Sequence, residues 1–94
     1  MAEYFARVEL FGADGEKYET LHEKMESIGF LRTVMYSDGK SQALPSGSYA
    51  GVKTSDLNQI REQISGVADP LSSKNASVFV CKLDGWAAYL YSAS

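Results

Sequence analysis

His22 is the only histidine in the chain, and imidazole is the side chain whose ordinary pKa lies nearest neutral pH. Glu26 follows one helical turn later, which is a suitable spacing for a general acid/base or for half of a metal pair. A histidine with no second histidine or cysteine nearby is a weak metal signal, so we predict no metal site. The alternative interpretation is a boundary residue that packs its ring on the edge of a core, and the sequence favours this alternative.

A cation and small hydroxyl side chains occur close together in the middle of the chain. Arg32 and Thr33 precede two polar stretches, Ser37–Lys40 and Leu44–Ser48. Hydroxyls beside a cation could hold a phosphate or complete a catalytic cluster. The same residue types are those that a hairpin turn and a bulge require, so both interpretations stay open.

Negative charge is concentrated in the first half of the chain. The net charge is −3, and the acidic excess lies in residues 1–47. No basic stripe is present, so nucleic-acid binding would need a few well-placed arginines rather than bulk charge. The acidic residues of this region could bind a hard cation, but a solvated helix face is favoured, and the same face could dock a basic partner. These residues are Glu16, Glu19, Glu23 and Glu26.

Length and composition indicate one ordinary globular domain. The chain has 94 residues, of which 45% are hydrophobic, and no apolar run is long enough to span a membrane. Cys81 is the single cysteine, which excludes an internal disulfide and cysteine-based zinc sites. Met1–Tyr4 has no signal-peptide character, so we expect a cytoplasmic protein with no membrane partner. No cofactor-binding motif is present, and we expect no cofactor.

The first elements that must position these residues are a strand and a helix. Alternation over Tyr4–Phe11 predicts a half-buried strand. Asp14 is suited to cap a helix, and Gly29 is suited to the left-handed residue that ends one. Apolar residues recur at helical spacing between them, at Tyr18, Leu21, Met25 and Ile28.

A hairpin is predicted next. Phe30–Ser37 is rich in β-branched and aromatic residues and predicts the second strand. Asp38-Gly39 indicates a type I′ turn, which needs positive φ at both central positions. The return strand begins at Lys40, is interrupted by a bulge or loop at Leu44–Gly47, and resumes over Ser48–Lys53.

The second half repeats the strand–helix–strand order. Thr54 or Ser55 is predicted to cap a second helix, and Asp69-Pro70 to end it. Ala76–Leu83 predicts a further strand, and a second Asp-Gly pair leads into a fifth strand at Trp86–Tyr91. The apolar stripe of this helix is Leu57, Ile60, Ile64 and Val67.

The order βαββαβ with an extra strand predicts a single α+β domain over residues 1–94. Both helices must bury an apolar stripe, and both can do so on one face of a four-stranded antiparallel sheet. The predicted fold is therefore a ferredoxin-like sandwich. Its expected strand order is 4-1-3-2, with two helices on one face and a short C-terminal fifth strand.

The other face of this sheet is expected to be open. Leu31 and Met35 are predicted to face the core on the second strand, and Phe79, Cys81 and Leu83 on the fourth. Aromatic and cationic side chains would then share the open face, where they could stack bases and pair with phosphates. The alternative is a homodimer interface, because an uncovered apolar patch favours burial. The mixed set on this face is Phe5, Arg7, Arg32, Tyr36, Tyr49 and Lys82.

A sequence pattern in the first half is more specific than this topology. Phe5–Phe11 is followed by Tyr18–Arg32, which contains YxxLHxxM and runs into GFxRT, then by Asp38-Gly39, Leu44-Pro45 and Tyr49. In this pattern the chain resembles a family of small bacterial proteins, the type V antitoxin endoribonucleases (GhoS-like). The resemblance implies a ferredoxin-like fold related to the CRISPR adaptation nucleases. It also implies cleavage of the messenger RNA for a small membrane toxin.

The resemblance places the family's arginine at Arg32 and its helix histidine at His22. The related metal nucleases carry an aspartate at the end of the first strand, where this chain has Leu10-Phe11. If RNA is cut, we therefore expect metal-independent transesterification, with Arg32 stabilising charge and His22 or Tyr36 moving a proton. The RNA-binding residues would be Phe5, Arg7, Tyr49 and Lys82.

Two other functions fit the composition. A compact acidic domain could be a phage-encoded inhibitor, like an anti-CRISPR protein, that occupies a basic nucleic-acid site on a defence complex. The helix from Asp14 to Glu26 would then be the contact surface. A homodimeric scaffold with no ligand of its own is the third hypothesis.

Overall fold

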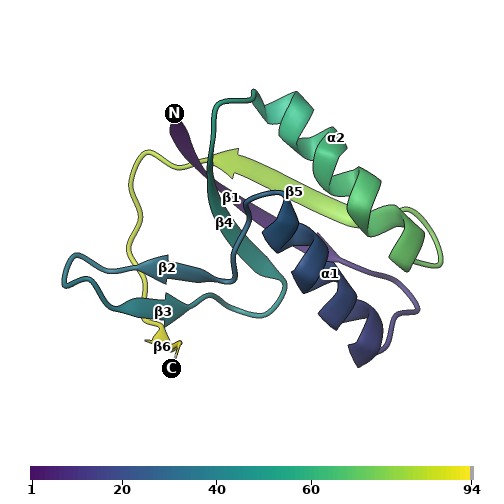
Figure 1. The fold of residues 1–94 in the computed structure, drawn as a ribbon, viewed down its shortest axis with the longest axis horizontal. Coiled ribbons are helices and arrows are strands. Elements are labelled where there is room, and N and C mark those ends of the chain that lie inside the picture. Colours follow the sequence, from purple (N-terminus) through teal and green to yellow (C-terminus); the bar gives the residue numbers. More distant parts are fainter. Residues whose placement is uncertain (94) are drawn as a thin grey trace.

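The chain has an α+β fold with two helices and antiparallel sheets, in a computed structural model that describes residues 1–93 (Figure 1). None of the helices in this range is long and apolar enough to cross a membrane. The elements in chain order are β1 (Ala2–Glu9), α1 (Gly15–Ser27), β2 (Thr33–Met35), β3 (Ser41–Ala43), β4 (Ser48–Lys53), α2 (Leu57–Ala68), the 3-10 turn η1 (Asp69–Leu71), β5 (Ser77–Lys82) and β6 (Tyr91–Ser92).

The strands form two sheets of three strands rather than one sheet of four. The first sheet has the order β4-β1-β5, and the second has the order β2-β3-β6. The predicted four-stranded sheet with order 4-1-3-2, which is β5-β1-β4-β2 in the labels of the structure, is therefore wrong. The strands β5, β1 and β4 are neighbours in one sheet, but β2 belongs to the other sheet. An isolated antiparallel bridge joins Leu31 to Ala50 of β4, with backbone N–O distances of 2.9 and 2.8 Å. Beyond this bridge the chain turns away, and β2 pairs with β3 instead.

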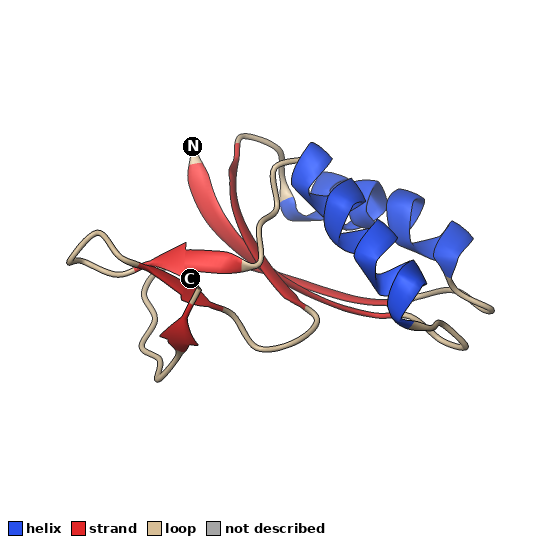
Figure 2. Cartoon of the chain, turned by 60° about the horizontal axis from the view of Figure 1, so that its bottom comes forward, coloured by secondary structure: helices blue, strands red, loops and turns tan. Residues whose placement is uncertain are grey.

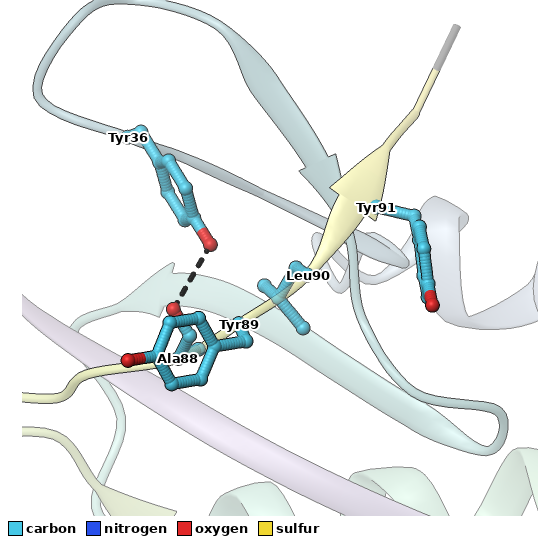
Figure 3. Close-up of a pocket in the computed structure, with 5 residues that line it drawn as sticks. All are labelled: Tyr36, Ala88, Tyr89, Leu90 and Tyr91. Carbon is cyan, nitrogen blue, oxygen red and sulfur yellow. Dashed lines mark hydrogen bonds between the residues drawn. The ribbon is translucent and has the colours of Figure 1, made fainter.

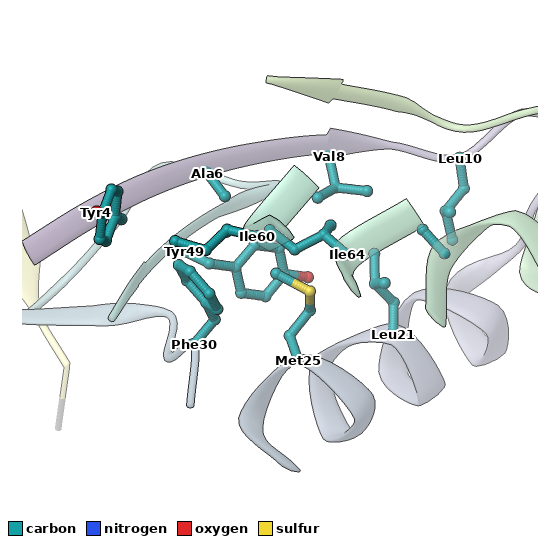
Figure 4. Close-up of a cluster of buried hydrophobic side chains, with 11 residues drawn as sticks. Tyr4, Ala6, Val8, Leu10, Leu21, Met25, Phe30, Tyr49, Ile60 and Ile64 are labelled. Atoms are coloured by element: carbon teal, nitrogen blue, oxygen red, sulfur yellow. The ribbon is translucent and has the colours of Figure 1, made fainter. Parts of the chain in front are cut away.

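Both helices cover the same face of the first sheet, as predicted. Ala6 and Val8 of β1, and Leu10 directly after it, lie in one buried cluster with side chains of both helices (Figure 4). Figure 2 shows α1 and α2 together on one side of the first sheet, with the second sheet projecting beyond them. The helical contributions to this core are Leu21 and Met25 of α1, and Ile60, Ile64 and Ala68 of α2.

The predicted orientation of the fourth strand is wrong. In β5, Val78 and Val80 stand opposite Val8 and Ala6 and pack against the core, whereas the Phe79 side chain is 63% exposed. Both alternating sets of this strand are apolar, so hydrophobicity could not select the buried face. A one-residue shift of register exchanges the two faces of a strand, and here the valines take the place beneath the helices.

The second predicted strand also differs. Leu31 and Met35 are exposed, and Val34 is buried. The reason is that this strand leaves the first sheet, and its Val34 side faces residues of the C-terminal segment between Leu83 and Leu90. That segment is irregular, so the predicted strand over Trp86–Tyr91 is replaced by the two-residue β6, which pairs with β3.

Local signals at the helix ends are borne out in part. Asp14 caps α1 by accepting a hydrogen bond from the Lys17 backbone N–H at 3.0 Å, and Gly29 has φ 91° after its end. The second helix is capped by Asp56 rather than by Thr54 or Ser55, because Asp56 forms a reciprocal capping box with Gln59.

The turn between β2 and β3 also departs from its prediction. Only Gly39 has a positive φ, at 82°, so the turn is not type I′. The Gly39 N–H donates to the Tyr36 carbonyl at 2.9 Å, and the Asp38 carboxylate accepts from the Lys40 N–H at 2.9 Å. The expected interruption of the return strand is present, since β3 ends at Ala43 and β4 begins at Ser48.

Candidate functional site

An open pocket of about 410 Å³ brings two of the predicted site residues together. His22 projects into it from α1, and Arg32 reaches it from the connection between Phe30 and β2. They are ten positions apart in sequence. The turn at Gly29 reverses the chain after the end of the helix, and this reversal brings Arg32 back toward His22. We call this cavity the His22 pocket, and its lining is His22, Arg32, Thr33, Ala43, Leu44, Pro45, Ser46, Gly47 and Ala93.

The imidazole of His22 is hydrogen-bonded to Tyr49 on the side that faces the core. The Nδ1 atom lies 2.7 Å from the Tyr49 hydroxyl, and the two ring centroids are 5.8 Å apart. Tyr49 belongs to β4, points into the core and is fully buried. Because Nδ1 is engaged by a buried partner, Nε2 is the nitrogen left to serve the pocket. The tyrosine hydroxyl can donate to Nδ1 or accept from it, so it supports either neutral tautomer of the histidine.

The electrostatics of the pocket favour an uncharged pair. Burial lowers the pKa of His22 below its ordinary value of 6.5, and the Arg32 charge lowers it further, while Glu19 acts in the opposite direction. Burial raises the pKa of Tyr49 to about 12, against the influence of Arg32. At neutral pH His22 is therefore a neutral imidazole beside a protonated phenol, which is the form a general base needs.

Arg32 supplies the positive charge of the pocket. Its side chain is exposed and makes no salt bridge within residues 1–93. The salt bridge found in this range joins Arg61 and Glu62 of α2. A guanidinium without a carboxylate partner is free to bind a phosphate or carboxylate in two-pronged geometry.

The loop between β3 and β4 forms the wall opposite the helix. Ser48 N–H donates to the Pro45 carbonyl at 3.0 Å, and Gly47 has φ 80°, so the loop is a tight turn that needs glycine. This is one of the two polar stretches noted in the sequence, and it lines the pocket beside Arg32. The other stretch, Ser37–Lys40, forms the tip of the hairpin and does not line it.

Arg7 lies on the other side of the same turn. It lines a neighbouring pocket of about 280 Å³ that shares Ser46 and Gly47 with the His22 pocket, and this pocket also contains Glu9. The second cation is thus adjacent to the first pocket, but an acidic residue lies beside it.

The remaining predicted RNA-binding residues are scattered. Phe5 is half-buried and lines an apolar pocket of about 190 Å³ against Trp86 and Val34. Tyr49 faces the core rather than the open face, and Lys82 stands opposite Tyr4, on the side of the sheet that the helices cover. Both orientations are corrections to the prediction, and their reason is the actual register of β4 and β5 on β1.

Tyr36 is separate from the other two predicted catalytic residues. Its hydroxyl donates to the Ala88 carbonyl at 3.2 Å (Figure 3). Its ring centroid lies 6.1 Å from that of Trp86. It lines a different pocket, of about 500 Å³, together with Ala88, Tyr89, Leu90 and Tyr91.

The acidic residues of α1 are all solvent-facing. The side chains of Glu16, Glu19, Glu23 and Glu26 are exposed, and none makes a salt bridge within residues 1–93. In the same range, no group of three or more histidine, cysteine, aspartate or glutamate side chains is arranged to hold a metal ion.

Sequence reasoning missed Tyr49 as the partner of His22 and Ala93 as part of the wall. No local signal connects His22 to a residue on β4, and consecutive buried residues at Ser48, Tyr49 and Ala50 hide the alternation that would reveal direction. Neither a protein-family model nor a curated protein matches this chain.

Proposed function

We propose that the protein binds single-stranded RNA in the His22 pocket and cleaves it without a metal ion, as an antitoxin-like endoribonuclease. The observation that carries the proposal is the convergence of His22 and Arg32 on one open pocket, with the histidine ring fixed by Tyr49. The resemblance of residues 5–49 to the type V antitoxin endoribonucleases supports the same assignment, with the transcript of a small membrane toxin as the substrate.

The chemistry is an internal transesterification of RNA. His22 Nε2 accepts the proton of a ribose 2′-hydroxyl, and the oxygen attacks the adjacent phosphorus. The bond to the 5′ oxygen breaks, and this oxygen takes back the proton from His22, directly or through a water molecule. The products are a 2′,3′-cyclic phosphate and a free 5′-hydroxyl. Arg32 stabilises the negative charge that develops on the phosphate oxygens.

Tyr49 acts in this scheme as a positioning residue. When His22 accepts a proton at Nε2, its Nδ1–H donates to the Tyr49 hydroxyl, 2.7 Å away. The ring therefore keeps one orientation through the proton transfer. Tyr36, the other candidate for moving a proton, has no part in this scheme because it lines a different pocket.

The test is cleavage of an end-labelled transcript from the neighbouring gene, with and without EDTA. Native protein should give a 2′,3′-cyclic phosphate in both conditions, and a 2′-deoxy substitution at the cleaved position should prevent the reaction. His22→Gln and Arg32→Gln should each lose activity about 10²-fold or more. Arg61→Gln is the matched control, since Arg61 is an exposed arginine on α2. Intact RNA at high concentrations of native protein would overturn the proposal.

A second candidate function rests on the acidic surface of α1. Its four exposed glutamates make no salt bridge within the described residues, so they are available to a basic partner. The partner would be a basic nucleic-acid site on a defence complex, and the protein would be its inhibitor. Charge reversal of Glu19 and Glu23 should then abolish capture of the complex, and unchanged capture would remove this role for α1.

We also propose that the protein is a homodimer. Leu31, Val52 and Phe79 leave apolar surface exposed on the face of the first sheet that the helices do not cover. Burial of such a surface favours association. Light scattering after size-exclusion chromatography measures the mass directly, and a native monomer at all concentrations would refute the dimer.

We also propose that the fold is related to the ferredoxin-like sandwich. The order β4-β1-β5 corresponds to three expected neighbours of a ferredoxin-like sheet, and the Leu31–Ala50 bridge would mark the place of the fourth strand. We infer a divided variant of that sandwich, in which the hairpin has moved off the sheet edge.

A further inference from the structure

Tyr91 lies next to the His22 pocket in the pairing of the second sheet. Thr33 of β2 stands opposite Ala43 of β3, and Ala43 stands opposite Tyr91 of β6. Directly opposed residues of antiparallel strands project from the same face, with Cβ atoms about 5 Å apart. Thr33 and Ala43 both line the His22 pocket, as does Ala93, two residues beyond Tyr91. The tyrosine therefore stands at the rim of this pocket.

The Tyr91 ring is available at this rim. Its side chain is 88% exposed, and it lines the adjacent pocket that contains Tyr36 and Tyr89. Figure 3 shows Tyr89 and Tyr91 projecting from the C-terminal part of the chain on either side of Leu90. A large aromatic ring left almost wholly in water gains little from the fold itself, but it offers a flat face to a ligand.

We propose that Tyr91 is a stacking platform for an unpaired RNA base that lies next to the phosphate bound by Arg32. This inference rests on the proposed function and names how the same site would bind its substrate. The phosphate and the base of one nucleotide need different partners, namely a cation and an aromatic face. Arg32, without a salt bridge in the described residues, supplies the first, and Tyr91 supplies the second from the adjoining strand row.

The ligand class follows from the surrounding charge. The chain carries a net charge of −3, so a long duplex held only by its phosphates would be repelled. Stacking is independent of this charge and is sequence-tolerant, which favours an unpaired strand with accessible base faces.

The experiment measures binding separately from cleavage. A fluorescein-labelled 2′-O-methyl oligonucleotide cannot be cut, because its attacking hydroxyl is blocked, and its affinity is read by fluorescence anisotropy at low salt. Tyr91→Phe should bind within about twofold of the native protein, because the ring remains. Tyr91→Leu should bind roughly 5- to 100-fold more weakly. Phe11→Leu is the matched control, a partly exposed aromatic outside the His22 pocket and the proposed dimer face, and it should bind like the native protein.

A second probe with one abasic nucleotide tests stacking directly. Native protein should bind the abasic probe more weakly than the intact probe, because the stacked base is missing. Tyr91→Leu should bind the two probes with equal affinity. Equal affinity of Tyr91→Leu and native protein for the intact probe would overturn the inference, as would an equal loss in Tyr91→Phe. Unchanged circular dichroism of each variant verifies that the fold is intact.

The two proposals fail in different ways. RNA cleavage by native protein together with unaltered binding by Tyr91→Leu would remove the stacking role alone. Tyr91-dependent binding of the methylated probe by a protein that leaves RNA intact would remove the cleavage alone. Absence of any binding to single-stranded RNA would overturn both.

Discussion

His22 and Tyr49 are 27 residues apart in sequence, yet the imidazole Nδ1 and the phenol hydroxyl lie 2.7 Å from each other. The contact joins a half-buried side chain of α1 to a fully buried side chain of β4. It is the point at which the candidate site is connected to the hydrophobic core.

Removal of the Tyr49 hydroxyl should weaken the fold measurably. Tyr49→Phe preserves the buried ring and deletes one hydrogen bond, so we expect the free energy of unfolding to fall by about 0.5–1.5 kcal/mol in urea denaturation. Tyr36→Phe is the control, because it deletes an exposed hydrogen bond to a carbonyl and should change stability by less than about 0.5 kcal/mol. Equal effects of the two substitutions would contradict the structural role of Tyr49.

Stability should depend on pH through His22. The folded protein holds the pKa of His22 below 6.5, so the unfolded chain takes up a proton first as the pH falls. The stability contributed by the neutral ring is therefore complete above pH 6.5 and is lost below it, until the folded protein is protonated as well.

Urea midpoints measured from about pH 5 to about pH 8 bracket this titration. His22→Gln removes this contribution, so its curve should be flatter than that of the native protein on the acidic side. Carboxylates contribute equally to both proteins and cancel in the comparison. Parallel curves for native protein and variant would refute the shift.

Neutralising Arg32 should move the pKa of His22 upward. The Arg32 charge is the second cause of the lowered pKa, after burial. Arg32→Gln should therefore bring the pKa closer to its ordinary value without reaching it, because burial remains. Since His22 is the only histidine, its Cε1 proton is assigned without ambiguity in an NMR titration. A titration midpoint unchanged by the substitution would show that the two side chains are farther apart than the pocket requires.

Substitution of Gly51 should destabilise the fold, although this glycine does not have a positive φ. A Cβ added there would overlap the carbonyl oxygen of Gly29 and press against the Phe30 ring. Gly51→Ala should therefore cost more than about 2 kcal/mol in the free energy of unfolding. Gly66→Ala, in the interior of α2 with open space around it, should stabilise the protein by about 0.5–1 kcal/mol. Similar unfolding midpoints for the two variants would contradict this packing.

The helices and the first strand could be predicted because their signals are local. Tyr18, Leu21, Met25 and Ile28 recur at one helical spacing, and the structure places all four on or against the core. The alternation of β1 is equally clear. These patterns depend only on which residues must leave water, so a single sequence is sufficient to recognise them.

Sheet partners could not be predicted in the same way. The path of the chain after Leu31 depends on whether β2 continues beside β4 or pairs with β3, and both choices satisfy the same β-rich residues. In β5, Val78 and Val80 alternate with Phe79 and Cys81, so either face could have been buried. The candidate site was anticipated at His22 and Arg32, but its remaining walls depend on this pairing and on β6.

The two walls of the His22 pocket belong to bodies that are joined by little backbone pairing. His22 belongs to the helical layer, whereas Thr33 and Ala43 belong to the second sheet, which the chain leaves at Ala93. The Leu31–Ala50 bridge lies where these two parts meet. A small rotation about that hinge would change the gap between imidazole and guanidinium while leaving each body internally intact. The width of the His22 pocket therefore depends on how the second sheet is placed against α1, and the Leu31–Ala50 bridge is one point that fixes this placement.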